Sequence, residues 1–144
     1  MWADALLAAE RTHLQQLLLW GGASCALGVL LLVLTIGGAR RSPIVFHFAA
    51  QSVAWGAVIL VVGVTGLRSL QLRDLGAATR LDRFLWLNLG LDTGYVAVGA
   101  TLALSAWLLG RRHGGVGAGV AIVVQGLALA VITARLLLVL EQFV

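Results

Sequence analysis

The chain has 144 residues, of which 60% are hydrophobic and only 11% are charged. Water-soluble domains carry about 25% charged residues, and small ones leave much of their surface in water, so this composition excludes a soluble globular domain. The net charge of +4 arises from scattered Arg residues, and it excludes the basic stripe of a nucleic-acid-binding protein.

The N-terminal segment 4–13 precedes the first apolar run. Asp4 and Glu10 lie where a secretory signal would be basic. We therefore expect the first apolar run not to be cleaved off as a signal but to be retained in the protein. Segment 4–13 then either extends the first helix or lies on the membrane surface as an interfacial helix. Cys25, the single cysteine, excludes a disulfide within the chain and is interpreted as a packing residue.

Four apolar runs follow, each with at least the 20 or so residues that a helix needs to cross the hydrocarbon of a bilayer. Continuous runs favour helices over barrel strands, and only these two structures satisfy their backbone groups in lipid. The sequence therefore predicts one all-α domain over residues 1–144, an antiparallel four-helix transmembrane bundle, which we expect in a bacterial inner membrane. The runs cover residues 14–36, 44–67, 84–109 and 116–140.

Three links join these runs. The links at 37–43 and 110–115 are short, so each is expected to join antiparallel neighbours. Each carries an Arg pair, at 40–41 and at 111–112, directly beside a span. Basic residues near span ends favour the cytoplasmic side, where we expect both pairs. The middle link, 68–82, is longer and mixes Leu with charged residues, which is compatible with a short interfacial helix.

The second run carries a polar patch near its start, formed by His47 and Gln51. A His at this position can ligate a haem or a chlorophyll-type pigment, but a bis-His haem requires a second His at the same depth. The second candidate, His113, lies in a turn. An interfacial hydrogen-bonding role is therefore the simpler interpretation of His47.

The third run carries the most informative polar residues. They are spaced 4, 3 and 4 residues apart, so they share one helix face, and the cost of polar groups in lipid directs that face into the bundle. These residues are Asn88, Asp92, Tyr95 and Gly99. Gly90 and Gly94 add two small residues at the spacing that allows helices to approach closely.

Asp92 and Arg135 are predicted to form an ion pair. At about 1.5 Å per residue, Asp92 lies roughly 12 Å from the start of the third run and Arg135 roughly 9 Å from the end of the fourth, on the same side. The pair would either lock two helices together or belong to a proton, ion or ligand site. Alternatively, Arg135 snorkels to the interface. Gln125 is expected to bond across to another helix. The candidate site comprises Asn88, Asp92, Tyr95, Gln125 and Arg135.

The segment 87–96 contains the pattern Asn-x-x-Leu-Asp-x-Gly-Tyr. This pattern resembles the signature of an uncharacterised bacterial family, a domain of unknown function, of small four-helix integral membrane proteins. Weaker matches between Arg11 and Leu138 extend the resemblance over most of the chain. The resemblance implies the four-helix fold and names no activity. Relatives often carry an acid at the position of Thr133, which this chain lacks.

Catalytic and metal-binding motifs are lacking: HExxH and GxSxG do not occur, and Asp92 has no second acid within its span. We expect a non-enzymatic protein without a metal ion, foremost a structural or accessory subunit of a membrane complex or a homo-oligomer, because 18 Gly residues permit close helix contacts. The first alternative is a binder of a small hydrophobic ligand such as a quinone, pigment or lipid at the candidate site. The second is a small proton-coupled transporter that uses Asp92. The expected partners are the bilayer and another membrane protein or a second copy, and not nucleic acid.

Overall fold

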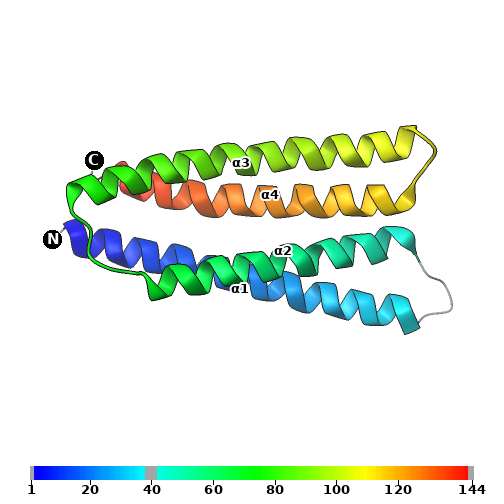
Figure 1. Ribbon diagram of the computed structural model, residues 1–144, viewed down its shortest axis with the longest axis horizontal. Coiled ribbons are helices and arrows are strands. Elements are labelled where there is room, and N and C mark those ends of the chain that lie inside the picture. Colours follow the sequence, from blue (N-terminus) through cyan, green and yellow to red (C-terminus); the bar gives the residue numbers. More distant parts are fainter. Residues whose placement is uncertain (1, 38–41, 143–144) are drawn as a thin grey trace.

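Four long helices make up the computed structural model, which describes residues 2–37 and 42–142 (Figure 1). They are α1 (Trp2–Gly37), α2 (Pro43–Arg68), α3 (Leu75–Leu108) and α4 (His113–Leu140). The shortest has 26 residues, and all four are long and apolar enough to cross a membrane. The predicted all-α class is confirmed, and the described part of the chain contains no strand. The Arg pair at 40–41 lies outside the described residues.

The helices pair as two hairpins, α1 with α2 and α3 with α4, and Figure 1 shows these pairs as two layers. α4 also packs against α1 and α2. α3, in contrast, approaches only α4 within 8 Å between Cα atoms. α2 and α3 are therefore not packed backbone to backbone, although they are neighbours in the chain.

Glycines allow the close approach within the α3–α4 hairpin. A Cβ atom added to Gly99 of α3 would lie 2.7 Å from the backbone oxygen of Gly119 in α4, so a larger residue would push the two helices apart. Gly90 and Gly94 lie on another face of α3, where an added Cβ would meet nothing within 4 Å. Among the residues that the structure describes, the close approach predicted for these two glycines is therefore not made.

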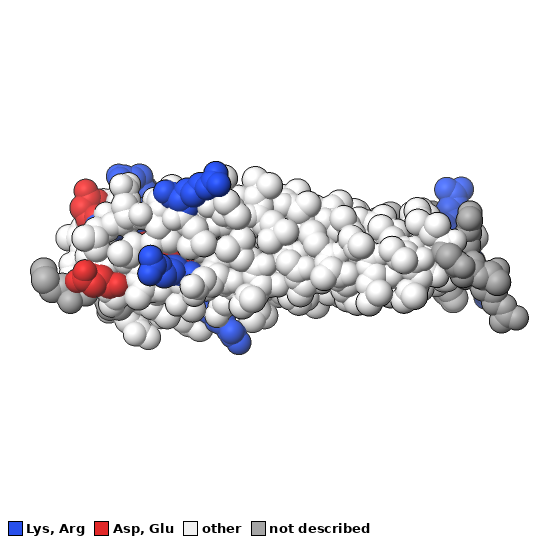
Figure 2. Space-filling view, turned by 90° about the horizontal axis from the view of Figure 1, so that it is seen from below, with Lys and Arg blue, Asp and Glu red and all other residues white. Residues whose placement is uncertain are grey.

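Charged side chains gather toward the two ends of the molecule and leave a long uncharged surface between them (Figure 2). On α4 the uncharged segment runs from His113 to Arg135, about 33 Å at 1.5 Å per residue. This length matches the hydrocarbon thickness of a bilayer, about 30 Å. We call this region the apolar belt, and it comprises residues 12–37, 43–67, 84–108 and 113–134. We call the end formed by residues 2–11, 68–83 and 135–142 the charged end.

α1 extends beyond the apolar belt at the charged end. It is continuous from Trp2, so the segment 4–13 is its first part and not a separate interfacial helix. Leu6 of α1 is fully buried there against Leu85 of α3 and Leu140 of α4. This small apolar cluster holds three helices together at the edge of the belt, because its leucines lose their contact with water.

The middle link does not form the single interfacial helix considered for residues 68–82. α2 ends at Arg68, residues 69–74 form a non-helical linker, and α3 begins directly after it. Asp74 caps α3, because its Oδ1 accepts a hydrogen bond of 2.7 Å from the backbone nitrogen of Ala77. An Asp at this position satisfies one of the free N–H groups of the first helical turn, which explains why the helix begins here.

Candidate functional site

Asp92 of α3 faces the interior of the molecule, as its place on the polar stripe predicted. Its side chain is only 6% exposed. Thr133 of α4 donates a hydrogen bond of 3.2 Å from its Oγ1 to Asp92 Oδ2. Thr133 occupies the position where the family resemblance suggested an acid, so here a hydroxyl donor faces the carboxylate instead.

Arg135 does not pair with Asp92. Its side chain is exposed and lines a separate hollow between α1 and α4, together with Thr12 and Gln16. The predicted ion pair is therefore wrong, because Arg135 lies on a different face of α4 from the one that meets Asp92. Arg135 follows Thr133 by two residues, which is about 200° around an α-helix, so the two side chains face opposite directions. The prediction matched the depths of Asp92 and Arg135 but not their directions.

A cavity of about 240 Å³ lies beside Asp92, and all four helices contribute to its wall. Trp55 of α2 closes one side, with its ring edge-on to that of Tyr95 at 4.9 Å between centroids. Apolar residues complete most of the remaining wall. We call this the deep cavity, and its other polar lining residues are His13, Asn88, Asp92 and Thr133.

Gln125 belongs to a different cluster. Trp20 of α1 donates from its Nε1 to Gln125 Oε1 at 2.7 Å, and Gln125 Nε2 donates to Ser24 Oγ at 3.1 Å. Gln125 thus bonds to another helix, as expected, but it does not line the deep cavity. Of the predicted site residues, the deep cavity brings together Asn88, Asp92 and Tyr95 and leaves out Gln125 and Arg135.

The second polar patch lies near the opposite end of the molecule. His47 is exposed, and its Nδ1 lies 2.8 Å from the backbone oxygen of Pro43 in the first turn of its own helix. Gln51 is half-buried one turn further along α2. His113 makes its ring contact with Trp107, at 6.3 Å between centroids. The arrangement fits the hydrogen-bonding interpretation of His47, whose ring also lies against Gly114 at the start of α4.

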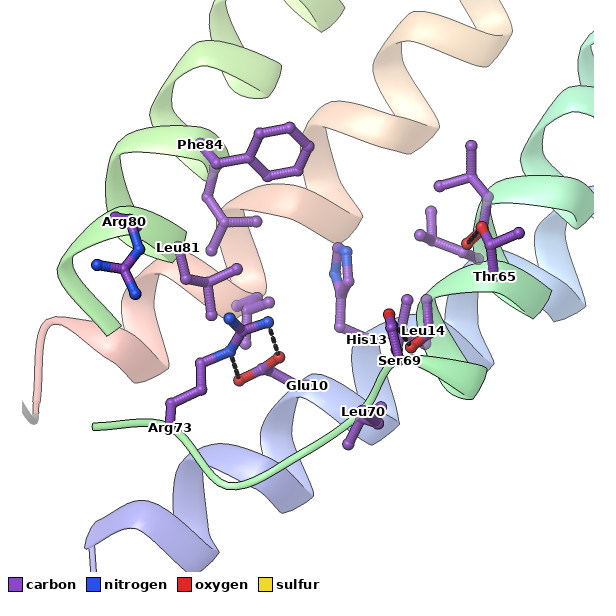
Figure 3. A pocket seen from close by; sticks show the side chains of 15 residues that line it. Glu10, His13, Leu14, Thr65, Ser69, Leu70, Arg73, Arg80, Leu81 and Phe84 are labelled. Carbon is purple, nitrogen blue, oxygen red and sulfur yellow. Dashed lines mark hydrogen bonds and ion pairs between the residues drawn. The ribbon is translucent and has the colours of Figure 1, made fainter. Parts of the chain in front are cut away.

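A larger cavity of about 570 Å³ lies where the charged end meets the apolar belt, and the linker 69–74 and all four helices line it (Figure 3). Arg73 of the linker binds the buried carboxylate of Glu10 through two hydrogen bonds, from Nε at 2.6 Å and from Nη2 at 2.8 Å. The hydrogen bond to Glu10 raises the pKa of Arg73 further above neutral pH, where a guanidinium is cationic in any case. Arg80 of α3 also lines this cavity, which we call the shallow cavity.

The two cavities adjoin each other between α2 and α3, above α1 and α4, and we treat them together as one groove. They share lining residues from three helices, namely His13, Leu17, Val62, Phe84 and Leu85. The groove lies where α2 and α3 are not packed together. Along α3 it extends from Arg80 to Asp92, which is about 18 Å at 1.5 Å per residue. We call it the α2–α3 groove.

The sequence analysis missed the residues at the mouth of this groove. Arg73 and Arg80 look like ordinary charges between spans, and Glu10 looks like one of several acids near the N-terminus. The distinguishing feature of Glu10 is its burial, at 5% exposed. That burial depends on the linker folding back over α1, which the pattern of apolar runs does not indicate.

These features define a small all-α protein with four helices long and apolar enough to cross a membrane, and with a groove between two of them. The chain belongs to a family of unknown function, DUF6992, whose model matches residues 16–133. No curated protein and no solved structure matches the chain. The family agrees with the uncharacterised class that the pattern at 87–96 resembles, and it assigns no activity.

Proposed function

We propose that this protein crosses a bilayer four times, with the apolar belt in the hydrocarbon, and that it binds a small hydrophobic molecule in the α2–α3 groove without catalysing a reaction. The groove is the observation that carries this proposal. Its walls are mostly apolar and hold a few converging polar groups, which is typical of sites for small ligands.

The position of the groove supports a ligand that comes from the membrane. Val62 of α2 and Phe84 of α3 line both cavities and are 51% and 59% exposed, so the groove opens sideways toward the lipid that surrounds the belt. One end of the groove holds Arg73 and Arg80, and the other reaches Asp92 inside the belt. An elongated molecule with a polar head and an apolar body fits the charged mouth and the mostly apolar walls between these two ends, because each part then meets surroundings of its own polarity.

Retention of a small molecule during gentle purification tests the proposal. Val62 lines both cavities and is 51% exposed, so Val62→Trp should fill the groove without entering the core. Val61, 63% exposed and outside both cavities, provides the matched control Val61→Trp. We expect native mass spectrometry to find a stoichiometric small molecule on the wild type and on Val61→Trp, and none on Val62→Trp.

An absorption spectrum of the same samples distinguishes a pigment or quinone from a colourless lipid. A wild-type protein without any bound molecule would contradict the proposal. So would a bound molecule that Val62→Trp retains as well as the wild type does.

Association with another membrane protein or with a second copy, which was the first expectation from the sequence, is the second candidate. Gly90 and Gly94 support it, because they leave an open strip on a face of α3 where a Cβ would meet nothing within 4 Å, and such strips allow a foreign helix to approach closely. The double variant Gly90→Leu with Gly94→Leu should abolish a co-purifying partner or dimer. Gly22→Leu, at an equally open glycine of α1, should not. An association unchanged by the double variant would remove the support for this candidate.

A further inference from the structure

We propose that the ligand of the α2–α3 groove is an anionic phospholipid, whose phosphate binds at Arg80 and one of whose acyl chains lies along the groove. This inference rests on the proposed function of the groove and assigns the chemical class of its ligand. Three observations support it: the charge at the mouth of the groove, the length of its apolar wall and its open side.

Arg80 is the cation that is free to bind an anion. It is exposed and lines the shallow cavity (Figure 3), and no described residue forms an ion pair or hydrogen bond with it. Arg73 lines the same cavity but already holds Glu10 on two hydrogen bonds. The lining of the shallow cavity thus holds two guanidinium groups and one carboxylate, and the nearby carboxylate of Asp74 is engaged as the cap of α3 through Ala77. A guanidinium forms paired hydrogen bonds with phosphate oxygens, in addition to its charge.

The length of the groove corresponds to one leaflet. From Arg80 to Asp92 it follows α3 for about 18 Å, and one leaflet contributes about 15 Å, half of the hydrocarbon thickness. A phosphate at Arg80 therefore stands just outside the apolar belt, where lipid headgroups lie, and an acyl chain reaches the deep cavity. Most of the wall along this path is apolar, and the polar residues of the deep cavity lie at its far end. The apolar wall includes Leu14, Leu17, Val62, Leu81, Phe84 and Leu85.

The open side determines where the ligand comes from. Because α2 and α3 are not packed together, a lipid of the surrounding leaflet can move a chain between them without leaving the bilayer. Inorganic phosphate would match the charge at Arg80 but leave the apolar wall uncovered. A neutral quinone or pigment would cover the wall but leave Arg80 without an anion. A phospholipid with a net negative headgroup satisfies both parts of the groove.

Competition between two lipids tests this inference. The full chain, purified in detergent, is offered phosphatidylglycerol and phosphatidylcholine with identical acyl chains, and native mass spectrometry measures the ratio retained. We expect the wild type to prefer phosphatidylglycerol by about three- to tenfold, the range for one charge-assisted contact that is partly exposed to water. Arg80→Gln should bring this ratio close to one. Arg83→Gln removes the same charge from a residue outside both cavities and should preserve the preference.

The outcomes separate this inference from the proposed function. Equal retention of the two lipids by the wild type overturns the assignment of an anionic headgroup. An equal loss of preference in Arg80→Gln and Arg83→Gln overturns it as well. The groove itself then still stands if Val62→Trp releases the bound lipid and Val61→Trp does not. Full lipid retention by Val62→Trp overturns both, because the lipid then binds elsewhere. Circular dichroism checks that each variant keeps its helical content.

Discussion

The carboxylate of Asp92 depends on a single hydroxyl group. This carboxylate lies inside the apolar belt and accepts a hydrogen bond from Thr133 of the neighbouring helix α4. A buried polar group that loses its partner costs more than the bond itself contributes, because water does not replace the partner. The position of Thr133 on α4 is therefore decisive for this site.

Thr133→Val should lower the stability of the protein, because it removes this hydroxyl at nearly constant volume. We expect the free energy of unfolding to fall by about 1–2 kcal/mol, as is usual for a polar pair between membrane helices. Thr93→Val is the control, since the hydroxyl of Thr93 is exposed and bonds to Leu89 of its own helix at 2.9 Å. Unfolding in mixed micelles, followed by circular dichroism, measures both. An equal fall in the free energy of unfolding of both variants would show that the bond to Asp92 contributes no more to stability than the exposed bond of Thr93 does.

Sequence periodicity predicted the direction of Asp92 but not its partner. The spacing of the polar stripe on α3 showed which face turns inward, because that spacing follows the helical repeat. The partner on α4 depends on how that helix is rotated about its axis, and depth arithmetic contains no rotation. Thr133 and Arg135 differ by only two residues, yet only Thr133 faces α3.

At the scale of elements, the linker 69–74 is tied to α1 by one bidentate ion pair. Arg73 and Glu10 are 63 residues apart in the chain, and their bond closes one wall of the shallow cavity. We expect the linker to cover α1 only while this contact is formed. The mouth of the α2–α3 groove therefore depends on it.

Arg73→Gln should strand a carboxylate that is 5% exposed. We expect the free energy of unfolding to fall by about 1–3 kcal/mol, because the remaining charge loses its partner in a partly buried site. Glu10→Gln and the double variant complete a thermodynamic cycle, measured by unfolding in mixed micelles, which should show a coupling of about 1 kcal/mol or more. A coupling near zero would mean that the pair does not hold the linker.

The close packing of the two helices in the α3–α4 hairpin depends on Gly99. Gly99→Leu should force the helices apart, since even a Cβ atom there would collide with the backbone of Gly119. We expect a loss of about 2 kcal/mol or more, as for other overpacked interiors. Gly94→Leu, on the open face of the same helix, should leave the stability nearly unchanged. Thermal unfolding of both variants compares them, and similar melting temperatures would contradict the described packing.

At the scale of the whole molecule, the number of helices and the two hairpins followed from the sequence, whereas the packing of one hairpin on the other did not. Length and apolarity alone predicted the four helices, because crossing hydrocarbon requires a fixed length. How the two hairpins pack on each other is set by contacts between residues far apart in the chain, such as Trp20 of α1 with Gln125 of α4. Short links did indicate the two hairpins. The longer middle link allowed α2 and α3 to stay apart, and the groove is the result of that separation.

The contacts of acyl chains with groove side chains test the account most directly. In lipid nanodiscs, nuclear Overhauser effects between acyl methylene protons and leucine methyl groups report such contacts. Leu17 and Leu85 are 7% and 3% exposed and line the groove, Leu137 is 3% exposed and lines neither cavity, and Leu104 is 59% exposed on the belt. The account predicts acyl cross-peaks at Leu104, Leu17 and Leu85 and none at Leu137. Acyl cross-peaks at Leu104 alone would contradict a groove occupied by lipid.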